Sequence, residues 1–248
     1  GRVMSEDVRR ALAELQAFIS RCRWGLEPID PLLSSFVACL YGLPIKVVDE
    51  GPVRTAAVAE VGGRPALIIH VDELLDAERR RFACFHEGAH IFFTHLREAS
   101  TKARADPTFN IKVHTIATDI FINSRVIAPR ARVPPDRLTY KWLSEFIEKR
   151  TKQHISPEEC AQRWPDWWDI YYLVMKLLPK EPGEGPVVPE GEGEDEGASG
   201  SAHTVDCRTI GFDPLRPETA DDLARRAREE SADAYQLGAG PPPALQAQ

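Results

Sequence analysis

Residues 82–95 read FACFHEGAHIFFTH, an apolar run that is interrupted by three histidines and one glutamate. On a helix each residue turns by about 100°, so His86 and His90 lie on one face, about 40° apart. Burying polar groups among phenylalanines costs free energy unless each group finds a partner. The segment therefore needs a buried partner for its imidazoles, and a metal ion between them would supply it.

The spacing H-E-x-x-H lets both imidazoles reach a single cation, and neutral imidazole is a good zinc ligand. Glu87 lies about 100° from His86 around the helix, where a carboxylate meets a metal-bound water without binding the metal. Such a carboxylate can accept a proton as the water attacks a carbonyl carbon. The bare pattern also arises by chance, but its apolar surroundings favour a zinc site with Glu87 as the general base.

A catalytic zinc ion is held by three protein ligands and keeps one position open. The segment HTIATDIFIN, residues 114–123, places Asp119 and Asn123 on one face of another apolar helix. A buried aspartate needs a partner, so we predict Asp119 as the third ligand. We expect Asn123 to hold a ligand or a backbone group in place.

Two further histidines have open roles. If the first helix continues, His95 lies about 180° from His86 and faces away from the metal, so we expect it to cap or pack the helix end. Support of a ligand or contact with substrate is the alternative. His114 either supports the site, donates to the substrate oxyanion, or is an exposed histidine near the start of its helix.

Periodicity and cap signals predict a mostly helical α+β fold. Helices are expected to begin near Ser5, at Asp30-Pro31 and at Asp76. A small antiparallel β-ribbon precedes the H-E-x-x-H helix, with strands at 44–48, 55–61 and 65–71 and a hairpin turn at Gly62-Gly63. The expected helices from there on are 78–97, 109–127, 137–149 and a Trp/Tyr-rich helix through residues 167–178 that follows a start signal at Ser156.

The composition changes abruptly at residue 181, where EPGEGPVVPEGEGEDEGASG consists almost entirely of Glu, Gly and Pro. Such a stretch cannot bury a core. We expect residues 1–180 to form the main domain and residues 181–205 a flexible acidic linker. Residues 206–248 contain an Ala-rich helix with a thin apolar face, which we expect to dock on the main domain.

Charge and cysteine usage limit the possible partners and the compartment. The formal net charge of −7 argues against a nucleic-acid partner. The five cysteines include no C-x-x-C pair, which indicates free thiols in a reducing compartment. No segment approaches the roughly 18 apolar residues of a membrane-spanning helix, and the start GRVMSEDVRR has no signal-peptide core. We expect a soluble cytoplasmic protein without a membrane partner.

The sequence resembles the metallopeptidase domain found N-terminal to VWA-like domains in many bacteria. HEGAHIFFTHLR resembles that family's H-E-x-x-H-x-x-x-x-H-x-R, and IATDIFIN its I-A-x-D-x-x-I-N. The resemblance implies a zincin-like domain in which His86, His90 and Asp119 bind Zn²⁺ and Glu87 is the catalytic base. It also implies a protein or peptide substrate and a VWA-domain or MoxR-type ATPase partner. The family usually has Trp-Asn where this chain has His114-Thr115.

Two other functions stay open. Arg80-Arg81-Phe82 ahead of His86 is similar to the RRFxxxHExxH of ImmA/IrrE-type peptidases, which cleave phage or stress repressors, although HTIATDIFIN does not reproduce their E-x-x-A-x-x-F-A segment. The second alternative is a non-catalytic interaction module that keeps the zincin scaffold. The acidic linker, the C-terminal helix and the aromatic run at 164–172 favour it.

Overall fold

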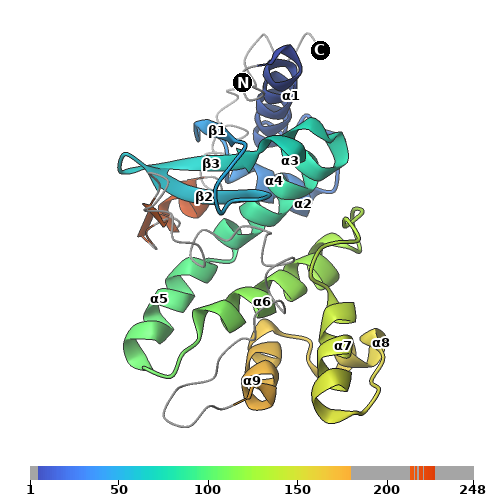
Figure 1. Ribbon diagram of the computed structural model, residues 1–248. Helices are drawn as coiled ribbons and strands as arrows, with labels where there is room; N and C mark the ends of the chain where they lie inside the picture. The colour runs from blue at the N-terminus through green and yellow to red at the C-terminus, as the bar shows by residue number, and fades with distance from the viewer. Residues whose placement is uncertain (1–4, 180–212, 215, 217, 220, 227–248) are drawn as a thin grey trace.

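The computed structural model describes residues 5–179, 213–214, 216, 218–219 and 221–226, and the expected linker at 181–205 lies outside them. The described part is a mixed α+β fold that is mostly helical (Figure 1). In chain order the elements are α1 (Glu6–Arg23), α2 (Pro31–Ala38), β1 (Ile45–Val48), β2 (Ala56–Val61), β3 (Arg64–His70), α3 (Val71–Leu75), α4 (Ala77–Phe92), α5 (His95–Ala105), α6 (Ile111–Phe121), the π-helix η2 (Ile122–Ile127), α7 (Tyr140–Thr151), α8 (Pro157–Arg163), α9 (Trp167–Leu177) and β4 (Asp213–Pro214).

Three predicted helix starts are confirmed, because each cap residue accepts a hydrogen bond from the first turn. Ser5 accepts from the backbone of Val8. Asp30 accepts from two backbone N–H groups of α2, with proline at the first helical position. Asp76 accepts from the backbone of Arg79 at the start of α4. These side chains satisfy N–H groups that have no partner inside the helix.

The sheet has the strand order β1-β3-β2-β4. Strands β2 and β3 form the predicted antiparallel hairpin, and its turn residues Gly62 and Gly63 have φ of 59° and 79°. The expectation that β1 is also antiparallel is wrong, since β1 pairs in parallel with β3. The reason is topological. In the sheet β3 lies between β1 and β2, and β1 and β3 both run in the direction opposite to β2.

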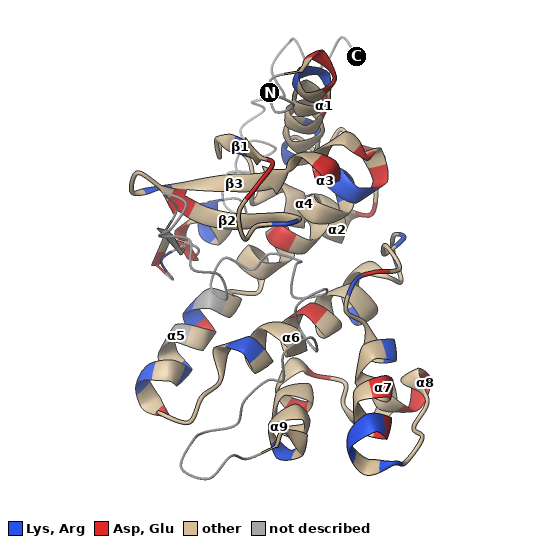
Figure 2. Cartoon of the chain, in the orientation of Figure 1, with Lys and Arg blue, Asp and Glu red and all other residues tan. Residues whose placement is uncertain are grey.

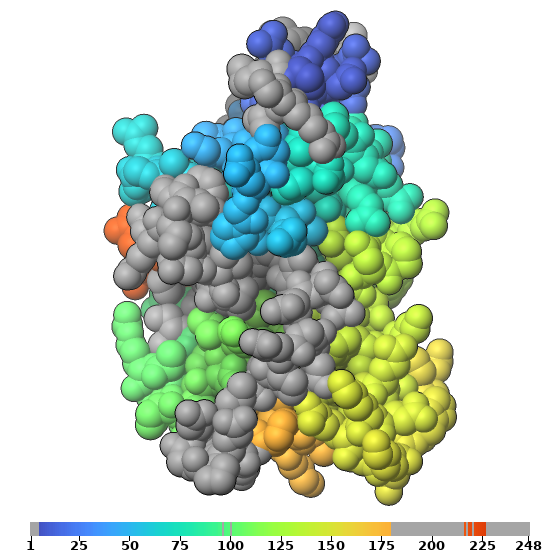
Figure 3. All heavy atoms as spheres, viewed as in Figure 1, coloured from blue at the N-terminus to red at the C-terminus, as the bar shows by residue number. Residues whose placement is uncertain are grey.

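Two hydrophobic cores organise the described helices. The first lies between the sheet, α1, α2 and α4, and the second between α6, α7, α8 and α9. Figure 3 shows the corresponding upper and lower halves, coloured blue to cyan and green to orange. The run α6–η2 joins them, because Ile116 and Ile120 belong to the second core whereas Ile122 and Ile127 belong to the first.

The single helix expected over 78–97 is interrupted. Helix α4 ends at Phe92 and α5 begins at His95, with Thr94 between them in the left-handed conformation (φ 57°, ψ 35°). A threonine in this conformation is strained, and no glycine marks the break in the sequence. The interruption turns His95 back toward α4.

The other helix boundaries differ less. The helix expected over 109–127 is α6 followed by one π-helical segment, and α7 starts at Tyr140 because Thr139 caps it. The start signal at Ser156 is confirmed, but it begins the short helix α8. The Trp/Tyr-rich helix α9 starts separately at Trp167, where Asp166 forms a capping box.

The cysteines and the surface charges are distributed as the composition suggests. Cys22, Cys39, Cys84 and Cys160 are free and buried, and Cys207 lies outside the described residues. Residues of both charge signs are mixed along the helices in Figure 2. Within the described part of the chain, no helix has both the length and the apolar composition needed to cross a membrane.

Gly88 lets α2 and α4 approach closely. A Cβ atom at this position would lie 2.1 Å from the backbone oxygen of Phe36. Backbone cannot move aside as a flexible side chain can, so only glycine fits between Glu87 and Ala89. The glycine inside H-E-G-A-H is therefore a packing requirement, which places the helix against α2 and fixes where its histidines point.

We predict that Gly88→Ala lowers the free energy of unfolding by about 3 kcal/mol, because overpacking against backbone outweighs the gain in helix propensity. Urea denaturation followed by circular dichroism measures the change. Glu78→Ala, an exposed residue in the first turn of the same helix, is the control and should change stability by less than about 0.5 kcal/mol. A Gly88→Ala variant as stable as the wild type would contradict the close approach.

Candidate metal centre

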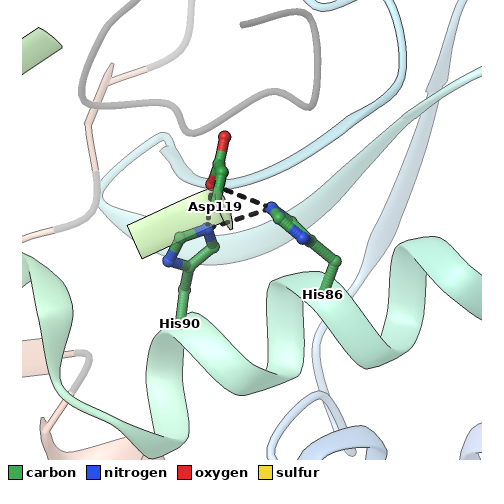
Figure 4. Close-up of side chains that lie close together, drawn as sticks. All are labelled: His86, His90 and Asp119. Atoms are coloured by element: carbon green, nitrogen blue, oxygen red, sulfur yellow. Dashed lines mark hydrogen bonds and ion pairs between the residues drawn. The ribbon is translucent and has the colours of Figure 1, made fainter. Parts of the chain in front are cut away.

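Two helices bring the predicted site residues together. Helix α4 presents His86 and His90 from consecutive turns, and α6 presents Asp119 from the opposite side (Figure 4). Their exposed fractions are 1%, 5% and 0%. The three residues form a buried cluster that could hold a metal ion.

The donor atoms form a nearly equilateral triangle. The Nε2 atoms of His86 and His90 are 3.1 Å apart, and each lies 3.0–3.1 Å from Oδ1 of Asp119. Tetrahedral ligands at zinc distances of 2.0–2.1 Å are separated by about 3.3 Å. An outward movement of a few tenths of an ångström is therefore enough for the three atoms to share one zinc ion.

The orientation of His86 is fixed by Asn123, as the sequence led us to expect. The amide Nδ2 of Asn123 donates to the backbone oxygen of Leu138 at 2.9 Å, which turns its Oδ1 toward Nδ1 of His86 at 2.8 Å. Nδ1 must then carry the proton, so in the neutral ring Nε2 presents a lone pair. In the neutral ring that lone pair faces the carboxylate of Asp119, so a cation between the two acceptors, either a second proton on the ring or a metal ion, would satisfy both.

His95 contacts His90, which contradicts the expectation that it faces away from the site. The Nδ1 atoms of the two rings are 3.0 Å apart, and the His95 ring stacks on Phe93. The turn at Thr94 produces this contact. With a metal on Nε2 of His90, its Nδ1–H donates to Nδ1 of His95, which is how outer residues commonly orient a histidine ligand.

Glu87 is buried beside the triangle, and its Oε1 has no hydrogen-bond partner among the described residues. Burial raises the pKa of its carboxyl well above the ordinary value, and the charge of Asp119 raises it further. A backbone hydrogen bond from Val58 and the charge of Arg137 oppose this rise. The carboxyl is therefore held as a strong proton acceptor with one oxygen available.

A small cavity adjoins Glu87. It measures about 10 Å³ and is bounded by His86, Glu87, Thr55, Phe82 and the buried ion pair of Glu73 with Arg137, among others. This volume is close to the minimum that holds one water molecule, but the surface that its walls expose is almost entirely apolar. The structure thus leaves a small, mainly apolar space beside His86 and Glu87.

The carboxylate of Asp119 is stabilised by its neighbours. Burial alone would raise its pKa, but the charge of His86 and hydrogen bonds from His86 and His90 outweigh burial and lower the pKa. Burial lowers the pKa of His90, partly opposed by its hydrogen bond with Asp119. Both shifts favour the protonation states that bind a metal: an ionised carboxylate and a neutral imidazole.

His114 is fully buried, so the alternative of an exposed histidine is wrong. Its Nε2 lies 3.1 Å from Oε1 of Glu98, which also accepts from Nε1 of Trp167 at 2.6 Å. The ring of His114 contacts that of His95, at a centroid distance of 6.3 Å. His114 thus belongs to a layer behind His95.

Sequence reasoning missed Glu98 and Arg137. Glu98 lies one residue past the helix expected over 78–97 and carries no periodic signal, and Arg137 pairs with Glu73 across 64 residues. Only the H-x-x-E spacing from His95 to Glu98 within the next turn could have pointed to Glu98, and only after the break at Thr94 was known.

We predict that His95→Ala and Asn123→Ala each weaken zinc binding by about 10–100-fold, because each residue orients one imidazole ligand. Competition with a chromophoric chelator measures the affinity. His154→Ala is the matched control, since this side chain is 71% exposed and should leave the affinity unchanged. Wild-type affinity in both site variants, with the fold intact by circular dichroism, would exclude this supporting role.

Comparison of the chain with family models, with curated proteins and with solved structures finds no match. The family assignment therefore stays a prediction that rests on the two quoted motifs, at 86–97 and 116–123. What the fold adds independently is that both motifs meet at one buried cluster.

Proposed function

We propose that the protein is a zinc-dependent peptidase with a zincin-like domain. The observation that carries this proposal is the convergence of the Nε2 atoms of His86 and His90 on one oxygen of Asp119, within 3.0–3.1 Å. A single metal ion bound by all three atoms would satisfy them together and leave both imidazoles neutral. Three protein ligands are also the number that leaves a catalytic position open.

In this proposal each residue has a separate task. Zinc, when bound, polarises the substrate carbonyl and makes water a stronger acid. Glu87 accepts the proton of the attacking water at its available oxygen, Oε1. The same carboxyl then returns the proton to the leaving amine. Asn123 and His95 keep the two imidazoles aligned while this happens.

We predict that the purified chain contains close to one zinc ion, by inductively coupled plasma mass spectrometry, and that His86→Ala removes it. Glu87→Gln should retain the metal and lose at least about 100-fold in the hydrolysis of an unstructured protein such as casein, because it cannot accept a proton. Glu78→Gln, exposed on the same helix, is the control. Retained hydrolysis by Glu87→Gln would remove Glu87 as the base.

The burial of the cluster favours a second candidate function. The three donors are at most 5% exposed, as in structural metal sites. A chain whose metal only stabilises the fold would act as an interaction module. A VWA-domain or MoxR-type ATPase is the partner that the sequence resemblance implies, and a repressor-cleaving peptidase is the narrower enzymatic alternative.

The two functions differ at the fourth metal position. We predict that Co²⁺ substitution gives visible absorption bands that shift when a small hydroxamate is added, because the chain supplies only three ligands. The His86→Ala variant is the control, and it should give no bands. Bands that stay unchanged up to millimolar hydroxamate would favour the structural metal and the interaction module.

A further inference from the structure

Two contacts lie next to each other along the outer edge of β2. Its inner edge pairs with β3 along the whole strand. On the outer side β4 pairs antiparallel with Ala59 and Glu60. One residue earlier, the backbone of Val58 is hydrogen-bonded to the carboxyl of Glu87. An extended segment is therefore already bound next to the strand residue that contacts the proposed catalytic base.

Glu60 is the polar residue of this edge. Side chains alternate along a strand, so Glu60 projects on the same face as Ala56 and Val58, which belong to the core packed against α4. Its side chain is buried, and Oε1 accepts from the backbone N–H of Arg216 at 3.3 Å and from its Nε at 2.8 Å. Thr219 donates to the same oxygen at 3.4 Å. A buried carboxylate on this edge is thus neutralised by a guanidinium group from 156 residues away.

The remainder of this C-terminal segment (the described residues between 213 and 226) is held by side chains. Leu223 and Ala224 are buried in the first core. Asp221 forms an ion pair with Arg97 of α5 at 2.5 Å. Asp213 and Pro214 are the described residues of the segment that pair as strand. Figure 1 shows the segment beside β2. The anchors are therefore separable: a short backbone ladder, one guanidinium–carboxylate pair and one apolar contact.

We propose that the outer edge of β2, together with Glu60, is a binding site for extended peptides that carry an arginine, and that the chain's own C-terminal segment occupies it here. Strand addition to a sheet edge supplies backbone hydrogen bonds for any sequence, and specificity comes from side-chain sites beside the edge. Glu60 is such a site, because its Oε1 accepts from both the Nε and the backbone N–H of the same arginine, Arg216.

The location links this binding site to the proposed function. The role of the site in substrate selection rests on that proposed function. Val58 and Glu60 are two residues apart, or about 7 Å along the strand. A peptide that extends past β4 toward Val58 would therefore reach Glu87. Among the described residues of the C-terminal segment, strand pairing with β2 reaches Ala59, and Arg216 binds the side chain of Glu60. The segment behaves as an internal competitor for the edge.

Peptide binding to the full chain tests the proposal. The probe is a fluorescein-labelled peptide that copies residues 211–226, and fluorescence anisotropy gives the affinity. The Arg216→Ala, Leu223→Asp variant releases the internal segment, because it removes the guanidinium group and the apolar anchor. We expect this opened chain to bind the probe at least about tenfold more tightly than the wild type, in which the tethered segment competes.

A second comparison isolates Glu60. The opened chain should bind a probe with citrulline in place of the arginine about tenfold more weakly, since the charge is lost and the shape is kept. Adding Glu60→Gln should remove this preference, whereas the exposed control Glu50→Gln should keep it. Equal affinity of the opened chain for both probes, or no binding of either, overturns the proposal even if Glu60→Gln fails to fold.

The assay is independent of hydrolysis, because it is run in the Glu87→Gln background, which is expected to keep the metal and lose any hydrolysis. Binding with the arginine preference but without any peptidase activity of the wild-type chain would leave this site in place and reject the proposed function. Hydrolysis that is indifferent to arginine, with no probe binding, would reject this site alone.

Discussion

Two imidazole nitrogens and a carboxylate oxygen, buried and about 3 Å from one another, are the constraint on which the rest of the structure depends. His86 cannot turn away, because Asn123 holds its other nitrogen, and Asn123 is itself bound to Leu138. The cluster also joins the two cores, since α4 belongs to the first and α6 to the second. A cation at this point would therefore stabilise the packing of one half of the molecule on the other.

The backbone around the His86, His90 and Asp119 cluster is unusual at several positions. Gly88 brings α4 against α2, and Thr94 adopts a left-handed conformation so that His95 reaches His90. The π-helical segment begins directly after α6 and contains Asn123. π-Helical turns are rare and often occur at functional sites. Two departures from regular helix geometry and one close helix–helix approach within one small region are consistent with selection for the position of side chains, beyond stability alone.

Much of the candidate site could be predicted because it follows helical periodicity. His86 and His90, and likewise Asp119 and Asn123, are each four residues apart, and four-residue spacing gives a shared face whatever the tertiary structure. The position of His95 could not be predicted, because it depends on a left-handed threonine that local propensity disfavours. The parallel pairing of β1 and the contact of Glu60 with Arg216 were equally inaccessible, since both depend on contacts between distant parts of the chain.

The edge of β2 and the buried cluster of His86, His90 and Asp119 are connected through one residue, Glu87. The backbone of Val58 interacts with the carboxyl of Glu87, and Oε1 of Glu87 has no hydrogen-bond partner among the described residues, which in the proposed function makes it the proton acceptor. If both proposals hold, the strand that contacts the proposed base is also the strand to which an extended peptide adds, so β2 positions the peptide and Glu87 relative to each other. In our proposal, a peptide that pairs with β2 would be aligned relative to Glu87 by backbone geometry, and Glu60 would determine which peptide binds. In this proposal the backbone of β2 positions the bound peptide, and the buried side chain of Glu60 determines the specificity.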